Sequence, residues 1–266
     1  MTLTAPSPAV TPTRRIRVQH WVLGCSAVAL LPMVAVHLAG AERVDPIDQP
    51  ISHYAFVPTG YEMILLGSVL LAVAALAIGT AIARTARRAQ RSGRAGLIAP
   101  ALLLGTFVVA MMLVGVFPTD RPGTLGDPST SALIHRWAAS YAFAVMPIIG
   151  LLVSRSRMIT VRQRRQLRGL SLAVLAGTAL VFAIHFPLAA AGSHIPMFGL
   201  IERIGFVVMV AFLVVLSGML RPVQPADLPP TPARLTPGLR PNHSNCSASS
   251  NQAVSKVASS SSAVRS

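Results

Sequence analysis

Long apolar runs, separated by short polar segments, dominate this chain. Six of these runs have the length of about twenty residues that an α-helix needs to cross a bilayer core. Lipid offers no hydrogen-bond partner to free backbone groups, so each run is expected to be a helix and not an open strand. The pattern predicts an all-α membrane protein, a bundle of six transmembrane helices at residues 18–39, 61–83, 97–117, 133–153, 170–191 and 198–220.

Composition and charge agree with a membrane location. Hydrophobic residues make up 53% of the 266 residues and charged residues only 12%, whereas about a quarter of a soluble domain is charged. A soluble globular enzyme is therefore not expected. The net charge of +15 comes from basic residues in the segments between the apolar runs, so no nucleic-acid partner is needed to explain it. The lipid bilayer is the expected partner.

The basic residues also predict the orientation of the helices. Nineteen of the 23 lie on one side, in the N-terminus, the second and fourth connections and the C-terminal segment. The four on the other side are Arg43, Arg121, Arg136 and Arg203. Positive charge is retained in the cytoplasm, which predicts that both termini are cytoplasmic. Because arginine supplies all of these residues except Lys256, the composition hints at a GC-rich genome and a bacterial plasma membrane.

The two ends differ from the apolar region. Residues 1–17 and the Pro- and Ser-rich residues 221–266 are predicted to be disordered cytoplasmic segments around a transmembrane domain at 18–220. The C-terminal segment is either a plain solvated extension or a docking or phosphorylation segment. The first run, followed by Ala39-Gly40-Ala41, also resembles a cleavable signal peptide. However, it is longer than the usual apolar region of 7 to 15 residues.

Ionisable side chains gather near the predicted outer ends of the helices. Five of the seven histidines lie there, namely His37, His53, His135, His185 and His194. Ionisable groups inside membranes are costly, so a functional role is the default hypothesis. Carboxylates follow the third run and open the sixth. The residues expected to converge on one outward-facing cavity are His37, Asp120, His135, His185 and Glu202.

Two kinds of chemistry fit this group. Imidazoles with a carboxylate are a common zinc set, so a divalent metal such as zinc is a candidate cofactor. The candidate ligands are His135, Asp120, His185 and His37. Alternatively, Asp120, His135 and Glu202 form a catalytic group for acid–base chemistry on a lipid headgroup or envelope precursor.

Three interpretations without catalysis stay open. In the first, the histidines lie at headgroup level and have no special role, because imidazole can bond to water and phosphate there. The same group is also suited to a small-molecule carrier or a proton sensor. The chain is otherwise an accessory subunit that packs on a membrane partner.

The order of several short motifs resembles one membrane family. Phe117-Pro118-Thr119-Asp120 ends the third run, His135 opens the fourth, and Glu202-Arg203 opens the sixth. With Ser52 before the second run, these features resemble the bacterial family catalogued as domain of unknown function 998, over about residues 18–220. The resemblance implies an integral membrane protein of about six helices and brings no assigned reaction. By carry-over, it marks Ser52, Pro118, Asp120, His135, Glu202 and Arg203 as pattern residues.

Overall fold

A computed structural model describes residues 16–40, 42–88, 91–124, 126–156, 159–191 and 196–219 of the chain. Contacts divide the chain into residues 1–224 and 225–266, and all described residues belong to the first unit. The predicted disorder of the C-terminal segment and of residues 1–15 therefore lies outside the described residues, as does His194. Among the described residues the secondary structure is entirely helical.

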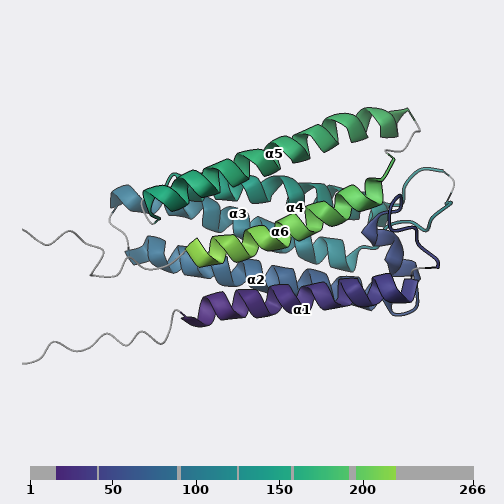
Figure 1. The fold of residues 1–266 in the computed structure, drawn as a ribbon, viewed down its shortest axis with the longest axis horizontal. Helices are drawn as coiled ribbons and strands as arrows, with labels where there is room; N and C mark the ends of the chain where they lie inside the picture. The colour runs from purple at the N-terminus through teal and green to yellow at the C-terminus, as the bar shows by residue number, and fades with distance from the viewer. Residues whose placement is uncertain are drawn as a thin grey trace, which may run out of the picture. The chain divides into compact units, whose positions relative to one another are not determined.

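Six long helices and one short 3₁₀ helix make up this unit (Figure 1). The elements are α1 (Ile16–Gly40), η2 (Ile51–Phe56), α2 (Gly60–Arg88), α3 (Arg91–Val116), α4 (Thr130–Ser154), α5 (Val161–Ala190) and α6 (Phe198–Met219). All six long helices are long and apolar enough to span a membrane. The all-α prediction with six spanning helices is thus confirmed, and the chain is built as a multi-pass membrane protein.

Several helices extend beyond the predicted runs. Helix α1 begins at Ile16, two residues early and inside the segment predicted to be disordered, α2 ends at Arg88 and not at residue 83, and α3 begins at Arg91 and not at residue 97. The largest difference is at α5. Its first turns begin nine residues before the predicted start at residue 170 and contain four arginines. The apolar run marks only the part of a helix that suits lipid, whereas the backbone continues as a helix into the polar region. Prolines occur inside α1, α3, α4 and α5, at Pro32, Pro100, Pro147 and Pro187. Neighbouring helices make such interruptions tolerable in membranes.

Consecutive helices pack side by side from α1 to α5, and α6 returns to pack on α1, α2 and α4 (Figure 1). Within the described residues, α5 packs mainly on α4. Only 6% of the apolar 18-residue stretch that identifies α5 as a spanning helix is buried. The corresponding share is 50% for α4. Helix α5 therefore lies at the margin of the bundle, with most of its surface available to lipid.

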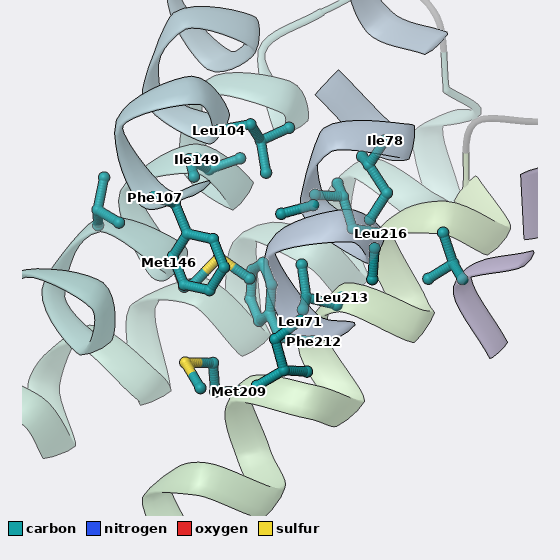
Figure 2. Close-up of a cluster of buried hydrophobic side chains, with 14 of the residues drawn as sticks. Leu71, Ile78, Leu104, Phe107, Met146, Ile149, Met209, Phe212, Leu213 and Leu216 are labelled. Carbon is teal, nitrogen blue, oxygen red and sulfur yellow. The ribbon is translucent and has the colours of Figure 1, made fainter. Parts of the chain in front are cut away.

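The centre of the bundle is filled by large side chains from α2, α3, α4 and α6 (Figure 2). Phe107 of α3 and Phe212 of α6 are fully buried there, next to Met146 of α4. Gly150 allows the close approach, because a Cβ atom at this position would overlap the Phe212 ring and the Ser171 hydroxyl. We call this region, with Ile78, Leu104, Ile149 and Leu216, the close-packed half of the bundle.

Candidate functional site

A cavity of about 80 Å³ lies inside the bundle, in the half next to η2. Side chains from α1, η2, α2, α3, α4 and α6 line it, whereas α5 contributes none. We call this region the cavity half. The cavity is far larger than the roughly 10–15 Å³ that one water molecule requires. It therefore has room for part of a small molecule.

The walls are mostly apolar, and methionine is prominent among them. The larger apolar side chains are Met33, Met63, Met111, Met209, Phe143 and Phe206. Small residues, including Gly67 and Ala139, create the space. The polar lining residues are Ser52, Ser68, His135 and Glu202. Flexible thioethers adapt to different ligand shapes, so these walls suit an apolar group of variable form.

His135 is buried in the second turn of α4 and is held by the end of α3. Its Nδ1 atom lies 3.1 Å from the Val114 carbonyl oxygen and 2.8 Å from that of Phe117. The last carbonyls of a helix lack partners within the helix, and here the imidazole supplies one. Since both neighbours are acceptors, Nδ1 carries the proton and donates it. In a neutral ring Nε2 is then an acceptor, and no hydrogen bond within the described residues engages it.

Glu202 reaches the same cavity from the first turns of α6. Its Oε2 atom accepts a hydrogen bond of 2.6 Å from the backbone N–H of Ile51, the first residue of η2. Ile51 and Ser52 also line the cavity. The carboxylate therefore holds the start of η2 in place and contributes to the wall behind it.

Arg203 points away from the cavity, toward α1 and the loop before η2. Its Nε donates to His37 Nε2 over 2.6 Å, and Nη1 donates to the Gln49 carbonyl over 2.9 Å. The guanidinium carbon lies 5.5 Å from the centre of the Tyr54 ring, within cation–π range. His37 Nδ1 donates in turn to the Met33 carbonyl at 2.7 Å. Both ring nitrogens of His37 are thus occupied, and the ring is neutral.

Backbone contacts complete the attachment of the segment 42–59, which we call the η2 loop. The N–H of Leu200 donates to the Ile47 carbonyl over 2.9 Å, and that of Met197 to Asp48 Oδ1 over 2.8 Å. A Cβ atom on Gly199 would overlap the Gln49 carbonyl, so glycine is required for this approach. The start of α6 therefore holds the η2 loop over the end of the bundle.

Asp120 does not line the cavity but organises the start of α4. Its Oδ2 accepts from the backbone N–H of Ser129 at 3.0 Å, and the Ser129 hydroxyl caps α4 by accepting from Ala132 N–H. Hydrogen bonds from the Ser129 side chain and backbone lower the pKa of Asp120, because they favour the charged carboxyl. The charge of Arg136 lowers it further. This arrangement gives Asp120 a structural role in the connection between α3 and α4.

The two other described histidines near this end also lie off the cavity wall. His185 of α5 stacks on Phe198 of α6, with ring centres 4.9 Å apart. His53 is partly buried in η2, and its Nδ1 has no hydrogen-bond partner among the described residues. Burial lowers the pKa of His53, and the positive charge of Arg136 lowers it further.

Of the five residues expected to converge, the structure brings His135 and Glu202 to one cavity and places His37 beside it, against Arg203. Asp120 and His185 lie elsewhere. Within the described residues, no three His, Cys, Asp or Glu side chains are placed to share a metal ion. Zinc binding by His135, Asp120, His185 and His37 stays a prediction without a preformed ligand set in its support.

Sequence reasoning missed the methionine walls and Ser68. Their residues are ordinary members of apolar helices, and neither hydropathy nor spacing separates a cavity-lining methionine from a packed one. The signals for the η2 loop were the outer histidine His53 and the position of Ser52 and Arg203 in the family pattern.

Comparison with known proteins decides the family. The model for "Protein of unknown function (DUF998)" matches residues 23–219. The chain belongs to the DUF998 family. The matched segment of this DUF998 protein contains all six spanning helices apart from the first residues of α1, together with every polar residue that lines the cavity. No curated protein and no solved structure matches the chain.

Proposed function

We propose that this DUF998 protein binds a small amphiphile from the membrane. The observation that carries the proposal is one cavity that combines apolar walls with two ionisable side chains, His135 and Glu202. Ligand pockets are typically apolar with a few well-placed polar groups. The polar group of the ligand lies against His135 and Glu202, and its apolar part against the methionines and Phe206.

The site faces the outside of a bacterial plasma membrane in this proposal. Support comes from the arginines, which are concentrated at the ends of α2 and α5 away from the η2 loop. With this orientation both termini are cytoplasmic, and the cavity lies at the depth of the outer leaflet. A lipid, a lipid fragment or an envelope precursor is then the ligand within reach.

Blocking the cavity tests the proposal. Ala139→Leu fills the space with a larger side chain from α4, whereas Ala179→Leu makes the same change on the exposed surface of α5. The probes are radiolabelled hexylamine, hexanol and hexanoate, and the measurement is retention by protein in lipid nanodiscs above that of empty nanodiscs. We expect wild type and Ala179→Leu to retain at least one probe and Ala139→Leu to retain none. Equal retention by both variants, or none by wild type, would contradict the proposal.

Acid–base chemistry on the bound molecule is a second candidate, and the fixed tautomer of His135 favours it. Nδ1–H is engaged by two carbonyl oxygens, which leaves Nε2 unprotonated, as a general base requires. Comparison of lipid extracts from cells with wild-type protein and with His135→Gln, by mass spectrometry, tests it. A lipid species that accumulates only in the variant supports catalysis. Identical extracts from cells with equal amounts of folded protein would sink it.

A further inference from the structure

The polar groups of the cavity are matched to one class of ligand. Two of them offer acceptors: Nε2 of His135, whose proton sits on Nδ1, and the second carboxylate oxygen of Glu202, whose Oε2 holds Ile51. The hydroxyls of Ser52 and Ser68 can accept as well as donate. The polar surface of the cavity is therefore rich in acceptors.

Of the N–H donors around these groups, those of His135 and Ile51 are already in use, whereas Arg203 Nη2, which has no hydrogen-bond partner among the described residues, belongs to a side chain that does not line the cavity. The Nδ1–H of His135 is shared between the carbonyls of Val114 and Phe117, and the N–H of Ile51 is bound by Glu202. In the described lining of the cavity, an anionic ligand would find only the hydroxyls of Ser52 and Ser68 as donors. Because an anion that leaves water needs donors to replace its hydration, the cavity offers it poor compensation.

The charges around the cavity also favour a cationic ligand over an anionic one. Glu202 is the only residue with an acidic or basic side chain, other than histidine, in the described lining of the cavity. Arg203, the nearest basic residue along the chain, directs its guanidinium to His37, Gln49 and the Tyr54 ring and does not line the cavity. Phe143 and Phe206 add aromatic rings, which attract cations.

We infer that the cavity selects amphiphiles whose polar group is a primary ammonium, a cation with several N–H donors. This inference rests on the proposed function and names the ligand class for the same site. The ammonium donates to Glu202 and to Nε2 of His135, while the attached chain lies among the methionines. A hydroxyl can satisfy one acceptor but brings no positive charge to Glu202, whose only described cationic neighbour, Arg203, is bound to His37 and Gln49.

Competition among matched probes on the wild-type protein tests the inference and depends on no variant. In nanodiscs that hold radiolabelled hexylamine, unlabelled hexylamine is compared as a competitor with hexanol, hexanoate and hexyltrimethylammonium. Hydrogen bonds to charged groups contribute enough that we expect hexylamine to compete at least about tenfold better than each of the others. Hexyltrimethylammonium has the charge but no N–H donor, so equal competition by it would overturn the role assigned to donors.

Two outcomes separate this inference from the proposed function. Suppose that wild type retains hexanoate or hexanol as strongly as hexylamine and that Ala139→Leu abolishes this retention. The cavity then binds amphiphiles, and the predicted selectivity for an ammonium group is wrong. If no probe is retained by wild type, both proposals fail.

A second measurement uses Glu202→Gln, which keeps an oxygen for the Ile51 N–H but removes the charge. We expect it to reduce the preference for hexylamine over hexanol by about tenfold, and an unchanged preference would overturn the role of the carboxylate.

Discussion

The two halves of the bundle are built from the same helices but are held together differently. In the close-packed half, Gly150 receives the ring of Phe212 and the space between helices is filled. In the cavity half, small residues such as Ala139 leave room. His135 and Arg203 donate hydrogen bonds, and Glu202 accepts one, that hold the elements around the cavity. Close packing fills one half, whereas polar contacts surround an open space in the other. Substitutions should therefore have different consequences in the two halves.

The largest expected effect is that of Gly150→Leu in the close-packed half. Even a Cβ atom would overlap Phe212 and Ser171, so a leucine side chain must push α4 away from α5 and α6. Overpacking typically costs about 1–3 kcal/mol and occasionally more, and two blocked directions place this site at the upper end. We expect little folded protein on size-exclusion chromatography and a lowered thermal midpoint.

Ala139→Leu is the matched control on the same helix. It adds the same side chain where the cavity offers room, so we expect a nearly unchanged thermal midpoint. If both variants unfold alike, the two halves do not differ in packing. If both are tolerated, the close contact at Gly150 is not essential.

This contrast could not be read from the sequence, although the helices could. Apolar runs predict spanning helices because lipid demands internally bonded backbone, which is independent of how the helices meet. Gly150 and Ala139 are both small residues in one apolar run, and only the side chain opposite distinguishes them. Phe212, sixty-two positions along the chain, fills the space at Gly150, whereas no large group fills the space at Ala139.

Those parts of the candidate site that place ionisable side chains in apolar helices were predictable from the sequence. His135 and Glu202 are ionisable residues in spanning helices, and this contrast identified them together with their place in the family pattern. The pairing of Arg203 with His37 depends on the rotation of α1 and α6 about their axes, which the sequence does not specify. Asp120 was expected at the cavity because of its position next to α3. Instead, Asp120 accepts a hydrogen bond from the backbone N–H of Ser129, just before the first residue of α4.

An intermediate effect is expected at Arg203, where polar anchors replace packing. Arg203→Lys keeps the charge, but a single ammonium cannot reproduce both the bond to His37 and the bond to Gln49. Each hydrogen bond to a charged group contributes about 1.5–3 kcal/mol. We therefore expect amide exchange in the η2 loop to accelerate by at least about tenfold, while exchange in the centre of α2 and α3 stays slow.

Arg136→Lys is the control for this prediction, because Arg136 is exposed on α4 near the same end of the bundle. Its η2-loop exchange should match that of wild type. Slow exchange in Arg203→Lys would mean that the backbone bonds of Leu200 and Met197 suffice to hold the loop.

The smallest expected effect is that of Asp120→Ala, at the cap of α4 and outside the cavity. The pKa of Asp120 is lowered in the folded protein by hydrogen bonds from Ser129, so the charged carboxyl stabilises the fold. That contribution is fully present above the ordinary value of 3.8 and is lost as the pH falls through the lower value of the folded state. We expect wild type to be slightly more stable than Asp120→Ala at neutral pH, and the difference to shrink below that ordinary value.

Thermal unfolding of both proteins in the same detergent, from neutral pH down to about pH 3, measures this difference; the range extends below the reference value of an aspartate. Subtraction of the two curves removes the titration of groups that the proteins share. Retention of hexylamine by Asp120→Ala at neutral pH should equal that of wild type, because Asp120 does not line the cavity. Loss of retention in a variant of unchanged stability would instead place Asp120 in the binding site and remove the distinction between the cap of α4 and the cavity half.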